Sequence, residues 1–441
     1  MNASWTTYLP EPVREWLDGR LQLQKAIGNT GWLVFERVIR MVIGLTVGAW
    51  VARYLGPARF GELAYALSFI AFFQILADLQ VDGFVIRDIS REGVGAGLVL
   101  GTALRMRLTA GLGSWLAAAL MMLLLHPEQP ELALLTAVAG GTLVFQVADL
   151  VDCWFQSQSQ SKRTVKAKMV AYFVSNGLKV ILLLMKAPLV AFAAVISIEA
   201  AVFGLAVMAA YRGFPAGEPW SASRAEAARL LSLCWPFIAS GLMITAYMRI
   251  DQIMLKEMLG EKQLGIYAAA LPLAQVWNVI PTTMVASLAP FIARKKARGE
   301  EEYRQALVTI FRFFAVVSLA VALLTALVAP WVVELLYGAA YRESAAVLSL
   351  LVFVMVFVFQ GLAQSMWLVN ENLRAVNILS TAMGALVSVA SNYFLIRQYG
   401  VMGAALSCLL AQGTSVVILP CLLRQDLRSM YRRAFLGMRQ G

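Results

Sequence analysis

Residues 55–67 read Leu-Gly-Pro-Ala-Arg-Phe-Gly-Glu-Leu-Ala-Tyr-Ala-Leu, and a related stretch follows 204 positions later. There, residues 259–271 read Leu-Gly-Glu-Lys-Gln-Leu-Gly-Ile-Tyr-Ala-Ala-Ala-Leu, so that six of the thirteen paired positions are identical. In a chain rich in Ala, Leu and Gly, chance supplies roughly one or two matches at a given offset. The repeat therefore predicts a protein built from two similar halves, a prediction that hydropathy and charge can test.

The composition is that of an integral membrane protein. The 441 residues are 60% hydrophobic and 14% charged, with a mean hydropathy of +0.71, whereas a soluble domain is nearer half apolar and a quarter charged. Residues 1–30 carry charges and precede the first apolar run, so we expect no secretory signal peptide. The four isolated cysteines are expected to be small hydrophobic filler, and His126, in a His-Pro turn, to be a turn residue.

Apolar windows long enough to cross a bilayer predict twelve transmembrane helices joined by short loops. The predicted spans are residues 31–54, 60–85, 99–125, 131–155, 164–185, 188–211, 229–255, 263–291, 305–330, 343–369, 374–396 and 401–423. We therefore expect an all-α integral membrane protein, with twelve helices in two parallel six-helix lobes around a central cavity. The predicted helix at 263–291 contains three prolines, at 272, 281 and 290, which favour a bend.

The basic residues orient these spans. Most of the 37 Lys and Arg residues fall at alternate helix ends, for example at 162–168, 294–298 and 424–433, and the positive-inside rule places these ends and both termini in the cytoplasm. An even number of spans separates Gly56 from Gly260, so both Leu-Gly loops face outward and the halves are related by an axis along the membrane normal. We expect each loop to be a structural corner rather than a substrate site.

The predicted organisation has five parts. They are an N-terminal cytoplasmic or interfacial segment (1–30), an N-lobe (31–211), a Pro/Gly/Ser-rich cytoplasmic linker (212–228), a C-lobe (229–423) and a basic cytoplasmic tail (424–441).

Charges inside spans are expensive unless they face a partner or a cavity. The like-charged pairs Asp78/Asp82 and Asp149/Asp152 have two interpretations: pairing with Arg87, Arg91 or the arginines of the first span, or carriage of a proton by one member during transport.

The remaining in-span charges also leave alternatives open. Lys179 and Glu199 can pair across adjacent helices; otherwise Lys179 is a cavity cation. Arg40 can pair with Glu36, whereas Arg37 either reaches the inner surface or faces the lobe interface. Arg312 lies within reach of the surface or faces a cavity, and Arg249 lies near Asp251, which is expected to tie a helix to the outer loop.

Short motifs resemble those of bacterial polysaccharide (Wzx-type) flippases. They are Ala52-Arg53-Tyr54-Leu55-Gly56-Pro57 with Phe60-Gly61, Arg249-Ile250-Asp251-Gln252-Ile253-Met254-Leu255, and Gly265-Ile266-Tyr267-Ala268-Ala269-Ala270 with Pro281. These flippases belong to the multidrug/oligosaccharidyl-lipid/polysaccharide exporter superfamily, which also contains multidrug exporters and lipid II flippases. Lipid II flippases usually have fourteen spans, so twelve favours the polysaccharide branch.

The resemblance implies a flippase that moves an undecaprenyl-diphosphate-linked oligosaccharide across the bacterial inner membrane by alternating access, for O-antigen or exopolysaccharide synthesis. Cations suit the diphosphate, and the candidates are Arg37, Arg40, Lys179, Arg249 and Arg312. Candidate ion-coupling carboxylates are Asp78, Asp82, Asp149, Asp152 and Glu199. Expected partners are the lipid-linked substrate, membrane lipids, a polysaccharide polymerase and a chain-length regulator, with the protein itself a monomer and no role for nucleic acid.

Other functions remain as alternatives. The chain has no phosphate-binding loop, metal cluster or nucleophile motif, so we expect no cofactor and no enzyme activity. A multidrug or cation antiporter of the same fold is the first alternative, because several acids lie at inner helix ends. A membrane polysaccharide polymerase or glycosyltransferase is less favoured, because the outer loops are short and carry no acidic cluster.

Overall fold

A computed structural model describes residues 21–91 and 95–436, without the side chains of residues 21–38 and of Ala286. Most of the predicted N-terminal segment, the last residues of the tail and the side chain of Arg37 therefore lie outside the described residues. By its internal contacts the chain divides into two units, Met1–Gly48 and Ala49–Gly441. The described part of the first unit is helical, with the Thr46 hydroxyl donating to the Val42 carbonyl at 2.8 Å.

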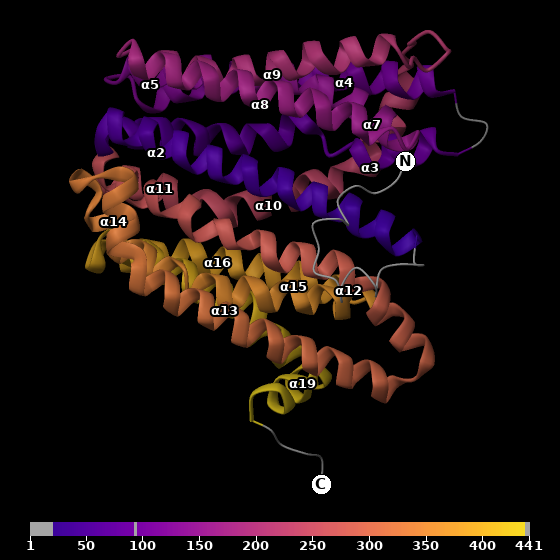
Figure 1. Ribbon diagram of the computed structural model, residues 1–441. Helices are drawn as coiled ribbons and strands as arrows, with labels where there is room; N and C mark the ends of the chain where they lie inside the picture. Colours follow the sequence, from indigo (N-terminus) through magenta and orange to yellow (C-terminus); the bar gives the residue numbers. More distant parts are fainter. Residues whose placement is uncertain (1–20, 92–94, 437–441) are drawn as a thin grey trace. The chain divides into compact units, whose positions relative to one another are not determined.

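Every described regular element is a helix (Figure 1). In chain order the helices are α2 (Leu21–Asp78), α3 (Asp82–Ile89), α4 (Ala96–Leu125), α5 (Pro130–Gly140), α6 (Thr142–Phe145), η2 (Gln146–Ala148), α7 (Asp149–Ser157), α8 (Ser161–Leu184), α9 (Leu189–Arg212), α10 (Arg224–Leu259), α11 (Glu261–Gln275), η3 (Val276–Asn278), α12 (Val279–Arg298), α13 (Glu300–Tyr337), η4 (Ala339–Tyr341), α14 (Glu343–Leu351), α15 (Val354–Asn370), α16 (Arg374–Tyr399), α17 (Val401–Gly413), η5 (Thr414–Ile418), α18 (Leu419–Leu423) and α19 (Gln425–Leu436).

Among the described residues, eleven helical segments are long and apolar enough to cross a membrane. The first, Ile39–Ile89, has 51 residues and would be about 77 Å long as one straight helix, against a bilayer core of about 30 Å. Gly56 interrupts it with a φ of 73° and a ψ of 167°, so it contains the first two predicted spans. The other ten coincide with the other ten predictions, which confirms the all-α membrane class.

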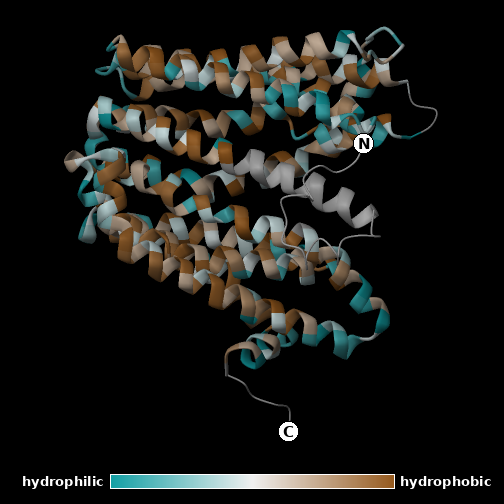
Figure 2. Cartoon of the chain, in the orientation of Figure 1, coloured by the Kyte–Doolittle hydropathy of each residue, from teal (hydrophilic) through white to brown (hydrophobic). Residues whose placement is uncertain are grey.

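Burial is inverted relative to a soluble protein. Large apolar side chains stand exposed along the spans, for example Leu205 at 74% and Leu327 at 66% exposure, whereas Asn392 and Ser318 are fully buried. Figure 2 shows hydrophobic residues along the helices and hydrophilic residues gathered towards many helix ends. This pattern suits a chain whose solvent is lipid, where polar groups must find partners inside the protein.

The two copies of the opening repeat adopt the same backbone bend. Gly56 (φ 73°) and Gly260 (φ 87°) are equivalent positions, and both lie in the left-handed region that favours glycine. Each bend follows the first helix of its predicted lobe and begins the second. The repeat is therefore a pair of corners, as the sequence predicts.

The two corners also contact each other, which the sequence does not reveal. A Cβ added to Gly61 would lie 1.9 Å from the Glu261 carbonyl oxygen, and one added to Gly265 would lie 1.8 Å from the Pro57 carbonyl oxygen. Pro57 and Glu261 are equivalent positions in the repeat, as are Gly61 and Gly265, so the contact is reciprocal, in the manner of a two-fold interface. Only residues without a side chain allow this approach.

Helix packing follows the order of the chain. Helices α4 to α9 pack on one another, helices α11 to α19 do the same, and α10 contacts α4 as well as α11 and α16. Figure 1 shows α8 beside α9 and α13 beside α15. The division into two six-helix lobes around a cavity stays a prediction.

Two departures from regular helices concern the second half. The predicted span 263–291 is divided into α11 and α12 by the 3₁₀ turn η3. Pro272 lies in α11, four residues before this turn, and Asn278 is the last residue of the turn. Pro281 lacks the N–H that would bond the carbonyl of Trp277, a residue of that turn, which accounts for the interruption of the α-helix there. The basic tail forms α19, which packs on α13 through stacking of Tyr431 on Phe311 at 5.0 Å.

Candidate functional site

A buried arginine on α4 forms the centre of the most charged site within the spans. Arg107 is 1% exposed, and its Nη2 lies 2.5 Å from Asp78 Oδ1 and 2.8 Å from Asp82 Oδ1. The thiol of Cys153 donates to Asp82 at 3.2 Å, so this cysteine is more than filler. We call Asp78, Asp82, Arg107, Asp149 and Cys153 the Arg107 cluster.

The expected partners of Asp78 and Asp82 were wrong in part. Arg87 pairs with Asp88 at 2.9 Å, and both aspartates use Arg107 instead. Arg107 lies within the predicted span 99–125 and was not among the candidate residues.

A sequence signal for Arg107 did exist. It shares a helical stripe with small buried residues at spacings of three and four, including Ala103, Gly111 and Ser114. Arg105, two positions away, is exposed. An arginine on the small-residue face of a span is directed inward, because that face packs most closely against other helices.

The helices that carry these acids are interrupted beside them. Between α2 and α3, Leu79 and Gln80 adopt φ values of 53° and 51°, a conformation that is costly for residues other than glycine. Arg107 Nε donates to the backbone carbonyl of Asp78 at 3.1 Å and so holds this turn. Interrupted membrane helices beside buried charges are typical of coupling-ion and substrate sites in transporters.

The second predicted acidic pair is split between two environments. Asp149 is the first residue of α7, directly after the 3₁₀ turn η2, and interacts electrostatically with Arg107 and Lys168. Asp152 is instead paired with Lys168 at 2.8 Å. Asp149 therefore belongs to the Arg107 cluster through its electrostatic interaction with Arg107, whereas Asp152 has a partner of its own.

The cluster holds more negative than positive charge. Three carboxylates surround one guanidinium, whose Nη1 has no hydrogen-bond partner among the described residues. An excess of acid within membrane-spanning helices is expensive unless a proton or cation neutralises it. Chemically, this arrangement can take up and release a proton or a small cation.

The candidate cations of the sequence lie apart from one another. Lys179 is within 4.0 Å of Glu199, which also accepts from the Ser175 hydroxyl at 2.6 Å, so the pairing interpretation holds for the geometry. Arg40 is half-buried and interacts with another group. Arg249 is exposed near Asp251.

Arg312 has a structural partner. Its Nε donates to the Ala434 carbonyl at 2.9 Å, and its Nη2 donates to the Arg433 carbonyl. It thus bonds the last turn of α19, where cations interact favourably with exposed carbonyls.

Asp251 also has structural partners. It accepts from the Tyr267 hydroxyl of α11 and from the Gln252 N–H, so it ties α10 to the next helix rather than to the outer loop itself.

A second polar network, near the two corners, was missed because its members come from distant segments. The Tyr65 hydroxyl donates to Glu257 Oε1 at 2.7 Å and lies 3.0 Å from His126 Nε2. Lys256 lies 4.9 Å from the Tyr65 ring centroid and 3.3 Å from His126 Nδ1. His126 is a turn residue, as expected, but it also joins a network between the two halves, which we call the corner network.

Comparison with known proteins gives a family and a fold. Residues 26–296 match the family described as "Polysaccharide biosynthesis protein". No curated protein matches the chain.

Three solved structures are similar. An inward-facing multidrug resistance MATE family transporter of the MOP superfamily has a TM-score of 0.72 and 17% identity, covering 89% of this chain and 96% of that one. The lipid II flippase MurJ, in an inward closed conformation, has a TM-score of 0.70 and 12% identity over 91% and 90%. A MOP superfamily transporter from Pyrococcus furiosus has a TM-score of 0.58 and 17% identity over 89% and 95%.

Proposed function

Since this chain belongs to the polysaccharide biosynthesis protein family, we propose that it moves a polyprenyl-diphosphate-linked oligosaccharide from the inner to the outer leaflet of the bacterial inner membrane. The chain is a multi-pass membrane transporter of the flippase type, with the fold of MOP superfamily transporters, and not an enzyme. The substrate, the coupling ion and the membrane are the parts that we propose.

The observation that carries the proposal is the Arg107 cluster within a polysaccharide-family transporter. A sugar diphosphate crosses about 30 Å of hydrocarbon only if the protein supplies a polar path and an energy source. Three acids around one arginine, beside interrupted helices, suit proton or cation binding that alternates with substrate movement. In this proposal Asp78, Asp82 and Asp149 couple the ion.

The cations for the diphosphate stay a prediction from the sequence. Of the five candidates, Lys179 and Arg312 have structural partners, and Arg249 is exposed, so the first substitution is made at Arg249. Rocking of two lobes would expose the path to each side in turn. We further propose cytoplasmic termini, a monomer, and a polymerase and chain-length regulator as partners.

One observation favours a second candidate. The excess of acid in the Arg107 cluster also suits a cation antiporter, and one similar structure is described as a multidrug resistance transporter. The two functions differ in the charge of the transported molecule, so a transport assay separates them.

The test is flipping of a fluorescent undecaprenyl-diphosphate oligosaccharide in proteoliposomes, with and without a pH gradient. We expect the protected fraction of label to change with time only in vesicles that contain the protein, and faster with the gradient. If no flipping occurs with or without the gradient, and the vesicles take up a cationic dye, the protein is a cation antiporter and the proposed flippase function is wrong. Vesicles with Asp149→Asn protein are the control for a coupled mechanism.

A further inference from the structure

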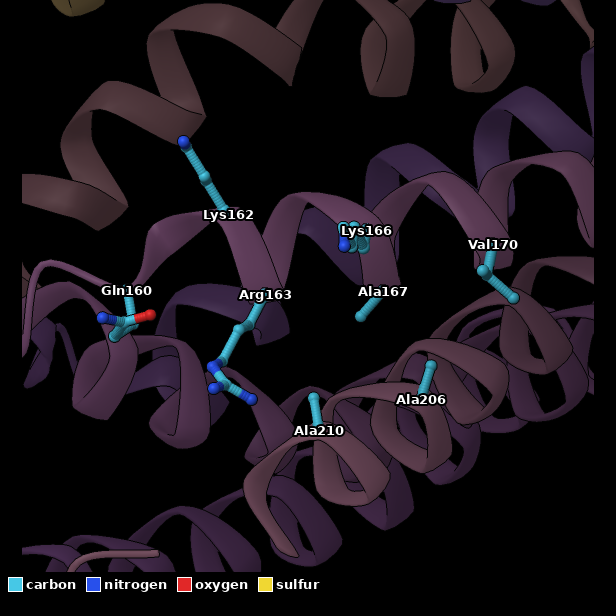
Figure 3. A pocket seen from close by; sticks show the side chains of 8 residues that line it. All are labelled: Gln160, Lys162, Arg163, Lys166, Ala167, Val170, Ala206 and Ala210. Carbon is cyan, nitrogen blue, oxygen red and sulfur yellow. The ribbon is translucent and has the colours of Figure 1, made fainter. Parts of the chain in front are cut away.

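A pocket of about 510 Å³ lies between α8 and α9, at the end of these helices that adjoins the segment 212–228 (Figure 3). Its polar side is formed by Lys162, Arg163 and Lys166, from the first two turns of α8. Figure 3 shows Arg163 reaching towards Ala210 of α9, whereas Lys162 points away from α9. The pocket is separate from the Arg107 cluster and none of its residues belongs to the proposed transport path.

The cations of this pocket have no acidic partner in the part of the chain that the structure describes. No acid lines it, and among the described residues none forms an ion pair with Lys162, Arg163 or Lys166. By contrast Lys168, on the same helix, is paired with Asp152 at 2.8 Å. Three neighbouring cations repel one another, so a bound anion would stabilise this arrangement of side chains.

The opposite wall of the pocket is apolar. Val170, Ala206 and Ala210 line it, and Val170 is 51% exposed. The pocket therefore opens onto a surface that suits acyl chains. A cationic end and an apolar wall together match a molecule with an anionic head and a hydrocarbon tail, and basic pockets between membrane helices bind such lipids.

Arg163 is fixed in place by the segment that joins the halves. Its guanidinium lies 5.2 Å from the ring centroid of Phe214, and the Phe214 carbonyl accepts from the Trp154 indole at 2.9 Å. A planar guanidinium stacked on an aromatic ring keeps its N–H groups free for a phosphate. A molecule bound here would contact residues that connect α9 to α10.

We propose that this pocket binds the phosphate headgroup of an anionic membrane phospholipid. Arg163 and Lys166 hold the phosphate, Lys162 adds charge at the rim, and an acyl chain follows the apolar wall at Val170 and Ala206. The predicted position at the cytoplasmic end of the spans fits the leaflet in which such cations meet anionic lipids. The site takes a lipid that stays in its leaflet, in contrast to the transported substrate.

The test compares lipid binding to the purified full-length protein in nonionic detergent, measured by native mass spectrometry. We expect retention of phosphatidylglycerol and little of phosphatidylcholine. Each cation contributes about fivefold to the affinity, so Arg163→Gln combined with Lys166→Gln should weaken phosphatidylglycerol binding about 25-fold. The matched control is Lys262→Gln, which removes an exposed charge near the corners and should leave binding unchanged.

A second variant tests the pocket without changing charge. Ala210→Leu fills the space opposite Arg163 and should also lower phosphatidylglycerol binding, while thermal melting verifies that each variant is folded. Equal binding of both lipids, or equal loss in Lys262→Gln, would overturn the proposal. So would a double variant that loses inorganic diphosphate or undecaprenyl diphosphate but keeps phosphatidylglycerol, since the pocket would then hold a substrate or free phosphate.

Discussion

Placing a methyl group between the two corners should loosen the contact between the halves. In Gly61→Ala the new Cβ would lie 1.9 Å from the Glu261 carbonyl oxygen and 2.9 Å from the Gly265 nitrogen. Ordinary contact begins at 3.4 Å, so the two backbones must separate by about 1.5 Å, the difference between 3.4 and 1.9. Both neighbouring atoms belong to the backbone, so the strain cannot be relieved by rotation of a side chain.

The magnitude follows from the overpacking of close contacts. Such insertions destabilise by about 1–3 kcal/mol, which shifts the population of the closed contact by about 5- to 150-fold. Gly265→Ala places its Cβ 1.8 Å from the Pro57 carbonyl oxygen and should act equally, because the contact is reciprocal. The double variant should fall short of additivity, since both changes break one contact.

The assay is cross-linking between the halves near the corners. The Ser68 hydroxyl donates to Gln252 Oε1 at 2.7 Å, so Ser68→Cys and Gln252→Cys in a background without the four native cysteines should be joined by a short thiol reagent. Gly61→Ala should lower the yield and the melting temperature together.

A glycine in open space provides the control for this experiment. Gly177, inside α8, has no atom within 4 Å of an added Cβ, and Gly177→Ala should leave the yield unchanged and stabilise α8 by about 0.5–1 kcal/mol. If Gly61→Ala and Gly265→Ala cross-link and melt like the parent protein, the close approach of the corners is refuted.

Three further predictions concern polar contacts between helices. Arg107→Gln leaves the acids of its cluster uncompensated and should destabilise the protein by about 3–5 kcal/mol, seen as a lower melting temperature, whereas the exposed Arg105→Gln should change it little. Asp149→Asn removes one carboxylate of the cluster and should abolish the response of flipping to a pH gradient while the protein melts normally; an unchanged response would exclude Asp149 from coupling. Arg312→Gln removes two hydrogen bonds to α19 and should speed amide hydrogen exchange in Gln425–Leu436, with unaltered exchange contradicting the bond.

Much of the fold follows from local pattern. Long apolar windows and charged ends predicted the spans because lipid imposes one rule on every segment, namely that about 20 apolar residues must bond their own backbone. The bends at Gly56 and Gly260 could also be predicted from the sequence, since the same Leu-Gly pair occurs twice. The 3₁₀ turn that divides the span 263–291 lies just before Pro281, for a similarly local reason.

The candidate site was less predictable. The sequence offered Asp78, Asp82 and Asp149 as candidate coupling acids, and that role stays a prediction, but it did not single out Arg107, which pairs with Asp78 and Asp82. Lys179 and Glu199 have the expected geometry because their helices are consecutive. The partners of Arg312 lie in a tail for which no helix was predicted.

The sequence alone determined a helical membrane protein with a repeated Leu-Gly corner, because hydropathy and glycine conformation act over a few residues. Only the tertiary structure decided that Gly61 and Gly265 contact each other and that Tyr65 donates to Glu257. It also decided that Arg107 interacts with three aspartates. These contacts join residues tens to hundreds of positions apart. Their energy depends on distances between helices, and packing sets those distances only when all the helices have assembled.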